Sequence, residues 1–582
     1  MKKTAPRQDW EKTAEEVGPH GSFGHAAMKM RRFSVFLFGI LCALLVLSAC
    51  SATADAAAFS GGSGTETDPY LISTAKDLWE LADKINTEET LKEYTGAFYR
   101  LTNDIDLGGK KKWTPIGNYS VNTYLWFEGT FDGGGHTIQG IRINYKDPLL
   151  GKKHSLFGLF GRLEGTVKDL TISNSSIAAE GESSIQVGAI AGDVRGGVLM
   201  NCHTTDSVSV SSSYYLGGIC GHADGDSTLS NCSNAASVTA AGTVSKAGGI
   251  TADAFCHVEA CSNSGSVVSR EADAAGIAVS ARSGISDCEN TGDVTAEDYA
   301  AGIVCHFDDG ALNPSMNDDT VSLLRCTNSG KITSEKDTAG GIAVSCRTGS
   351  IVDCRNTGSV TSPKETGGIF AYFQPAVFGT PCELFTVSGC ENSGAILSTA
   401  NNTAGGICGR IHGGKTTRLL FENCVNSGTV EASGLTDVLV SAAYAGGIIG
   451  EGTVSALEVR SCRNLGSVRG YAASGGILGY VSPIREAEET SLLVQDCTNS
   501  GSIYTVYPGG LKQEIYAGGI VGDCRLETDD EELLPAFDDL RIENCKNTGK
   551  LDGDRDPDIL CTDDICASRQ SRIQWTEDSD GA

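Results

Sequence analysis

The stretch Cys354-Arg355-Asn356-Thr357-Gly358-Ser359-Val360 is one copy of a phrase, Cys-x-Asn-x-Gly-x-Val, that recurs through the C-terminal two thirds of the chain. A second phrase, Gly-Gly-Ile, precedes most of the copies, as at Gly340-Gly341-Ile342. The mean period is about 34 residues, within the range of solenoids and repeat arrays. The copies begin at Cys202, Cys232, Cys261, Cys288, Cys326, Cys354, Cys390, Cys424, Cys462, Cys497 and Cys545.

Each period contains short apolar runs separated by Gly, Asn and Ser, such as 341–344, 350–354 and 359–361. These runs are rich in β-branched residues and too short for helices. Three strands and three turns per period describe one coil of a parallel β-helix, in which each coil pairs with the next at roughly 4.8 Å. We therefore predict an all-β solenoid.

In such a fold, each residue of the phrase stacks on its copies in neighbouring coils. Cys suits a small, buried, apolar position. Asn side chains can form a ladder of hydrogen-bonded amides, and Gly suits a turn with positive φ. The predicted structural ladder includes Cys261, Asn263, Gly265, Cys288, Asn290, Gly292, Cys354, Asn356, Gly358, Cys390, Asn392, Gly394, Cys424, Asn426, Gly428, Cys462, Asn464 and Gly466.

The chain has 22 cysteines, and half of them belong to the ladder. Stacked positions in register are poorly oriented for a disulfide, so we expect the ladder thiols to be buried and reduced. The sequence leaves open whether a few of the other cysteines form disulfides; these include Cys220, Cys305, Cys346, Cys408 and Cys524. No Cys-x-x-Cys or His-x-x-x-His pair occurs, so we predict neither a metal site nor a cofactor.

The N-terminal segment has the features of an export signal. Arg31 and Arg32 precede a mostly apolar run, 33–47, which is short for a membrane span. Leu47-Ser48-Ala49-Cys50 resembles the bacterial lipobox, which predicts acylation of Cys50 and a lipid anchor at the cell surface. The alternative is free secretion after cleavage within 52–58. Acidic residues in 1–27 are unusual for a signal, so translation is expected to begin at Met28 or Met30.

Five segments are predicted. Residues 1–50 are the N-terminal extension and signal peptide, 51–58 a linker, 59–172 an N-terminal cap with the first coils, 173–551 the repeating coils, and 552–582 an acidic tail or cap. Residues 74–86 are predicted to form a helix, because Thr74 and Asp77 are placed as a capping pair and Leu78, Leu81 and Ile85 make an apolar stripe.

The capping segment carries a family resemblance. Its motifs are Leu101-Thr-Asn103-Asp104-Ile-Asp106-Leu107, Trp113-Thr-Pro115-Ile-Gly117, Phe127-Glu-Gly129-Thr-Phe131-Asp132-Gly-Gly-Gly135-His136 and Gly158-Leu159-Phe160-Gly161. Together with the repeats, they resemble the GLUG-motif surface proteins of bacteria over roughly residues 59–551. The resemblance implies a right-handed parallel β-helix in an exported protein, with the helix covering the first coil. It implies no particular activity.

Charge and motifs exclude several functions. The formal net charge of −28 argues against nucleic-acid binding. Asp104, Asp106, Asp132 and His136 have the chemistry of a catalytic site, but they lie where Asp and Gly make turns, and a structural role is expected. No nucleophile elbow, metalloprotease motif or phosphate loop occurs. We predict no catalytic residue.

One column of residues has mixed chemistry. Tyr215, Tyr299, Tyr444 and Tyr516 stand two residues before the Gly-Gly-Ile position, where other coils hold Lys, Asp, Thr, Glu or Ala. Mixed chemistry suggests solvent exposure, and exposed tyrosines on a rigid sheet can contact a glycan or a protein. The alternative is that these tyrosines are ordinary surface residues with no role in binding.

The sequence thus favours an exported, non-catalytic binding or adhesion scaffold whose ligand, a polysaccharide or a protein, lies on an outer face. The runner-up is a carbohydrate-active enzyme, a polysaccharide lyase or hydrolase, with a site assembled from loops. A purely structural surface spike is the third hypothesis. Acidic residues clustered with Arg or Lys in one groove would favour the enzyme.

Overall fold

A computed structural model describes residues 59–120, 123–146, 156–181, 185–242, 245–308, 322–375, 382–400, 402–433, 443–485, 487–505, 515–524, 537–553, 559–560 and 574–576. The chain divides into two units, Met1–Ala58 and Phe59–Ala582, and every described residue belongs to the second. The predicted signal peptide, the lipidation site Cys50 and most of the acidic tail lie outside the described residues. No described helix has the length and hydropathy needed to span a membrane.

The second unit is a parallel β-helix, which confirms the predicted fold class. A typical coil contains β28 (Ala278–Ala281), β29 (Ile285–Ser286), β30 (Glu289–Asn290), β31 (Val294–Ala296) and β32 (Ala300–Ala301). Each strand pairs in parallel with its copy in the next coil; Ala278, for example, pairs with Val304. The coil has five short strands, so the prediction of three was wrong.

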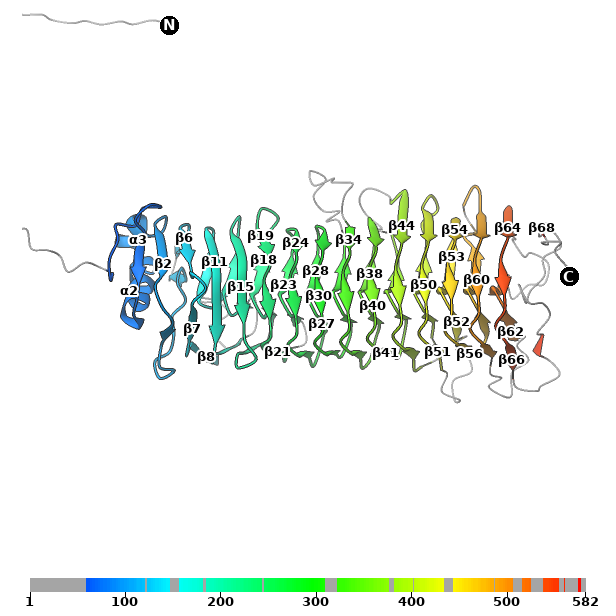
Figure 1. The fold of residues 1–582 in the computed structure, drawn as a ribbon, viewed down its shortest axis with the longest axis horizontal. Helices are drawn as coiled ribbons and strands as arrows, with labels where there is room; N and C mark the ends of the chain where they lie inside the picture. The colour runs from blue at the N-terminus through cyan, green and yellow to red at the C-terminus, as the bar shows by residue number, and fades with distance from the viewer. Residues whose placement is uncertain are drawn as a thin grey trace, which may run out of the picture. The chain divides into compact units, whose positions relative to one another are not determined.

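The strands stack into four long sheets along the solenoid (Figure 1). Among the described residues, sheet 1 has 28 strands and includes β29 and β30. Sheet 2 runs from β8 (Arg142–Lys146) to β66 (Leu551–Gly553), and sheet 3 from β9 (Leu156–Phe157) to β67 (Ile559–Leu560). Sheet 4 runs from β10 (Phe160–Leu163) to β63 (Val521–Asp523). Following the chain, each coil passes from sheet 1 through sheets 2, 3 and 4 and back to sheet 1.

A left-handed residue explains one of the two extra strands. The residue immediately before each ladder cysteine has positive φ, between 51° and 63°, in all eleven copies. It bends the chain within sheet 1, and β29 and β30 lie on either side of such a residue, Asp287. Asn and Asp tolerate this conformation best among residues with a Cβ, and they fill most of these positions.

The Asn ladder forms as predicted. The Nδ2 of Asn263 donates to Asn290 Oδ1 at 2.8 Å and to the Gly265 carbonyl at 2.9 Å, so both amide hydrogens are bonded. The same bond links successive amides from Asn234 to Asn547 at 2.7–2.8 Å. All these bonds point toward the C-terminal end of the stack. Chains of aligned hydrogen bonds strengthen one another in a low-dielectric interior.

The ladder glycines have a different role from the one predicted. Gly265, Gly292 and Gly358 do not have positive φ. Instead, a Cβ added at Gly358 would lie 1.9 Å from the Gly330 carbonyl oxygen, and one at Gly394 would lie 1.9 Å from that of Gly358. Glycine is therefore required because each turn rests directly on the turn below.

The ladder cysteines are buried and reduced, as predicted. Cys354 Sγ, for example, contacts the Leu323 carbonyl oxygen at 3.5 Å. No disulfide joins any two of the 18 described cysteines, which include Cys220, Cys305, Cys346, Cys408 and Cys524, and of the 18 only Cys545 is half-buried. The disulfides left open by the sequence are therefore absent among the described cysteines.

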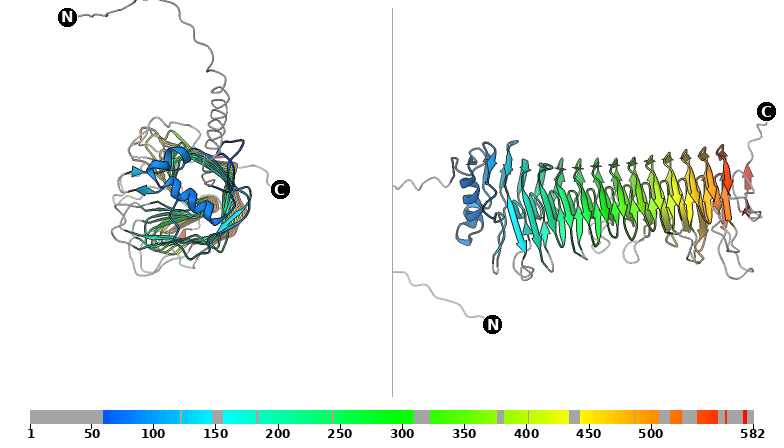
Figure 2. Two further views of the ribbon diagram at one scale, coloured as in Figure 1. Left: turned by 90° about the vertical axis from the view of Figure 1, so that its left-hand side faces the viewer. Right: turned by 90° about the horizontal axis from the view of Figure 1, so that it is seen from below.

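Two helices cover the first coil (Figures 1 and 2). α2 (Ala75–Ile85) begins after the N-cap Thr74 and has the predicted capping box with Asp77. α3 (Glu88–Tyr94) follows and was not predicted. The buried side chains of α2 include Leu78, Leu81 and Ile85. Figure 2 shows α2 lying across the end of the stack, where it covers an otherwise open edge.

Candidate binding site between sheets 3 and 4

Sheets 3 and 4 meet at a bend formed by the Gly-Gly-Ile units. A Cβ added at Gly340 would lie 1.6 Å from the Ala343 carbonyl oxygen, and one at Gly341 would lie 2.5 Å from Asn356 Cγ. The bend therefore packs against the Asn ladder, and such close approach requires glycine. Small buried side chains pack together where the two sheets meet: Ala275, Val279, Ala301, Cys305, Val344 and Ala371.

Two columns of larger side chains face each other across this bend. The sheet 3 column contains Tyr215, Lys246, Asp273, Tyr299, Thr338, Glu365, Thr403, Tyr444, Ala473 and Tyr516. The sheet 4 column contains His222, Asp253, Ser280, His306, Ser345, Tyr372, Arg410, Glu451, Tyr480 and Asp523.

Contacts between the columns are direct. Lys246 Nζ lies 2.8 Å from Asp253 Oδ1, and His306 Nε2 lies 3.0 Å from Asp273 Oδ2. Each residue of the sheet 4 column follows its coil partner by seven positions. This offset is the sequence signal that would have revealed the second column, and our sequence reasoning missed it.

The predicted exposure of the tyrosines is wrong for two of them. Tyr444 is 8% exposed and Tyr516 is 4% exposed, whereas Tyr215 and Tyr299 are half-buried. Tyr444 stacks on Tyr480, with ring centroids 4.6 Å apart. The mixed chemistry of the column reflects pairing with a second column and not free solvent. The register was correct, because Ala473 pairs with Tyr444 on one side and with Tyr516 on the other.

A pocket of about 420 Å³ opens in the middle of the columns. Its lining includes Tyr299, Thr338, Lys364, Glu365, Tyr372 and Arg410. Thr338 and Thr403 have short side chains at positions that hold tyrosine in other coils. The columns are therefore less filled here than at the stacked pair Tyr444 and Tyr480.

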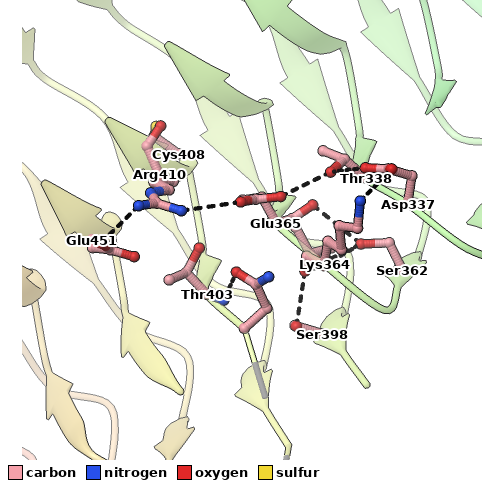
Figure 3. Close-up of polar contacts among 12 residues, drawn as sticks. Asp337, Thr338, Ser362, Lys364, Glu365, Ser398, Thr403, Cys408, Arg410 and Glu451 are labelled. Atoms are coloured by element: carbon pink, nitrogen blue, oxygen red, sulfur yellow. Dashed lines mark hydrogen bonds and ion pairs between the residues drawn. The ribbon is translucent and has the colours of Figure 1, made fainter. Parts of the chain in front are cut away.

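Arg410 lies between two carboxylates in this region (Figure 3). Its Nη1 is 3.4 Å from Glu365 Oε1, and its Nη2 is 3.5 Å from Glu451 Oε1. Thr338 Oγ1 donates a hydrogen bond to Glu365 Oε2 at 2.9 Å. Both contacts of Arg410 are longer than an ideal charge-assisted hydrogen bond. The guanidinium is held in place, with donor capacity left over.

A second ion pair stands beside the first. Lys364 Nζ contacts a carboxylate oxygen of Asp337, and this hydrogen bond raises the pKa of Lys364. Burial, with the neighbouring carboxylates of Asp273 and Asp337, raises the pKa of Asp298. Burial also raises the pKa of Tyr299. At neutral pH the pocket thus holds charges of both signs that are paired with each other.

The earlier acidic candidates have structural roles. Asp132 accepts hydrogen bonds from Arg100 at 2.7 Å and from the Gly134 N–H at 2.9 Å. Asp106 accepts the Gly108 N–H at 2.7 Å, and Asp104 accepts the Thr137 N–H at 2.9 Å. Within the described ranges, no group of three or more His, Cys, Asp or Glu residues could hold a metal ion.

Comparisons with known proteins support the family resemblance over one coil. The family described as "The GLUG motif" matches residues 212–239, a stretch that contains one Gly-Gly-Ile unit and one whole ladder phrase, 232–238. The resemblance to GLUG-motif proteins is therefore confirmed there.

Two relatives match about a third of the chain each. A "Putative Gly-rich membrane protein" of Evansella cellulosilytica is 34% identical over 193 residues, which are 31% of this chain and 19% of the relative. "Halomucin" of Haloquadratum walsbyi is 30% identical over 169 residues, which are 28% of this chain and 2% of the relative. The chain thus spans at most about a fifth of these relatives.

One solved structure was also matched, that of a "putative immunoglobulin A1 protease" from Bacteroides ovatus. The match covers 84% of this chain and 87% of that one, with 14% identity and a TM-score of 0.19. A TM-score this low carries no argument about function.

Proposed function

We propose that this chain is an exported surface protein whose β-helix is a rigid, non-catalytic binding scaffold for a glycan or a protein. The observation that carries the proposal is the pocket between sheets 3 and 4, where the two columns leave space on a regularly paired stack of strands. A preformed pocket on a rigid scaffold binds without the entropic cost of ordering a loop. The relatives described as a membrane protein and as a halomucin support a place outside the cell.

A binding screen tests this proposal. The purified chain would be applied to a glycan array and to immobilised cell-surface and matrix proteins, with a chain denatured and rapidly diluted as the control for non-specific adsorption. We expect saturable binding to at least one class by the folded chain alone. Absence of binding on both surfaces would leave the spike hypothesis as the better account.

One observation favours the second candidate, a carbohydrate-active enzyme. The carboxylates of Asp337, Glu365 and Glu451 gather with Lys364 and Arg410 in one region, the arrangement that we named as the mark of an enzyme. Two carboxylates flanking a sugar linkage can hydrolyse it. Release of reducing or unsaturated ends from a bound polysaccharide, lost in Glu365→Gln, would establish this candidate and overturn the non-catalytic scaffold.

A further inference from the structure

The shape of the pocket follows from one short residue. Where the sheet 3 column carries tyrosine, the ring fills the space between the sheets, as Tyr444 does against Tyr480. Thr338, which lies beside Glu365 in the column and lines the pocket, leaves that space open. The pocket volume of about 420 Å³ lies within the range typical of small-molecule sites, roughly 300–1,000 Å³.

The charges of the pocket select against an anionic ligand. Lys364 is paired with Asp337, and Arg410 is shared between Glu365 and Glu451. An anionic ligand could reach the spare donors of Arg410 only beside the carboxylates of Glu365 and Glu451, and like charges placed together repel each other. Hydroxyl groups can instead donate to the carboxylates and accept from the cations while the pairs stay intact.

Aromatic rings complete the site. Tyr299 and Tyr372 both line the pocket and both pack against the small buried side chains of the bend. Their rings offer apolar faces beside polar groups. This combination suits a molecule that has C–H faces and hydroxyl edges.

We infer that the pocket binds one or two neutral hexose residues of a glycan, with Tyr299 and Tyr372 against the sugar faces and Glu365 and Arg410 bonded to its hydroxyls. This inference rests on the proposed scaffold function and gives it a ligand class. Extended glycan chains would reach the pocket along the columns, which continue in both directions from it.

The test fills the pocket without removing any charged group. Thr338→Tyr places in the column a residue that four other coils already carry there, so the fold is expected to accept it. Thr361→Tyr is the matched control: it makes the same change on sheet 2, in a register column that already holds Tyr504. Unchanged melting temperatures would show that both variants fold.

Binding of the full chain would be measured on an array of neutral, N-acetylated and uronic-acid oligosaccharides and then by calorimetry with the best neutral hexasaccharide. We expect a neutral hexasaccharide to bind, Thr338→Tyr to abolish binding, and Thr361→Tyr to bind as the parent does. Tyr372→Ala should weaken binding by about tenfold.

Three results would overturn the inference. They are the absence of binding to every neutral oligosaccharide, a clear preference for uronic-acid oligosaccharides, and neutral binding that Thr338→Tyr leaves intact. The scaffold proposal can survive each of them. If the chain binds a protein surface equally well with and without Thr338→Tyr, the pocket assignment fails while the scaffold function stands.

Discussion

The residue before each ladder cysteine must adopt positive φ, and the residue types at these positions only partly reveal this. Seven of these eleven positions are Asn or Asp, and one is Gly389. Ala260, Arg325 and Ser461 adopt the same left-handed conformation with φ of 51–52°. A Cβ in this region costs roughly 1–2 kcal/mol, so the last three residues carry local strain that the coil imposes on them.

Ala260→Gly should therefore stabilise the protein. Removal of the Cβ relieves the left-handed strain, partly offset by the larger entropy of glycine in the unfolded chain, for a net gain of about 0.5–1 kcal/mol in the free energy of unfolding. Ala260 is exposed, so no packing is lost. The measurement is the urea unfolding midpoint. Ala395→Gly, the same change at an exposed residue without positive φ, should lower stability. Equal effects of the two changes would contradict the argument.

Removing one Asn side chain from the ladder should lower the stability of the protein. Asn392→Ala would remove the acceptor for the amide of Asn356 and the donor for the Oδ1 of Asn426, all of them buried. Buried groups left without partners cost roughly 1–3 kcal/mol. The melting temperature should fall, whereas Ser393→Ala at the exposed neighbouring position should leave it almost unchanged. The ladder argument would fail if both Asn392→Ala and Asn426→Ala melted like the parent.

At the scale of the element, the repeat predicted how the coils stack but not the structure of the turns between the strands. The period, the Cys and the Asn predicted stacking correctly, because a residue repeated at a fixed point in a solenoid must meet its own copies. The role of glycine was misjudged, since positive φ and close backbone approach both demand glycine and only coordinates separate them. At Gly358 the second reason applies.

The sequence predicted the position of the tyrosine column at the candidate site but not the burial of its side chains. The position of the tyrosine column could be taken from the Gly-Gly-Ile spacing. Its burial could not, because burial depends on a second column on another sheet. Pairs such as Lys246 with Asp253 show the seven-residue offset that links them. The pocket itself arises where the short side chain of Thr338 interrupts the sheet 3 column, which no single repeat displays.

The cap element predicts a pH dependence. Burial alone would raise the pKa of Asp77, but hydrogen bonds from Ser60, Ser73 and Thr74 outweigh it and hold the pKa below its ordinary value. A depressed pKa means that the carboxylate stabilises the fold above the unfolded value of about 3.9, and that this contribution is lost as pH falls through the folded pKa.

Asp77→Asn should therefore be less stable than the parent at pH 7, by about 1 kcal/mol, and the difference should shrink below about pH 4. Melting temperatures at pH 7, 5 and 3 measure it. Asp83→Asn, at an exposed residue of the same helix, is the control and should show no such trend. A difference that widened as the pH fell would be the opposite of the expected sign.

At the scale of the whole molecule, a stack of coils is stabilised mainly between neighbours, so its ends open more easily than its middle. The cysteines report on this directly, because the ladder places one thiol in nearly every coil. Burial shields a thiol from reagents in solution, so a buried ladder thiol reacts only when its coil opens.

Brief treatment with N-ethylmaleimide should therefore modify Cys545 first among the described cysteines and Cys354 among the last. Cys545 is half-buried and close to the C-terminal end of the described coils, whereas Cys354 is 0% exposed in the middle of the stack. Peptide mapping by mass spectrometry at several times gives the order. Uniform labelling of all ladder cysteines would mean that the stack opens in one cooperative step, contrary to the nearest-neighbour description.

Attachment of the whole molecule to a membrane is predicted to depend on Cys50, which lies outside the described residues. The lipobox-like Leu47-Ser48-Ala49-Cys50 would make Cys50 the acylated first residue of the mature chain, and acyl chains buried in a bilayer hold a protein there by about 0.8 kcal/mol per methylene. In a suitable bacterium the parent should sediment with membranes, and Cys50→Ala should be released or stay unprocessed. Cys42→Ala, a change in the same leader segment, should sediment like the parent because it leaves the lipobox intact. Intact-mass evidence that the mature chain begins at Asp55 or Phe59 would contradict the anchor and establish free secretion, because a chain cleaved there no longer contains the residue that carries the lipid.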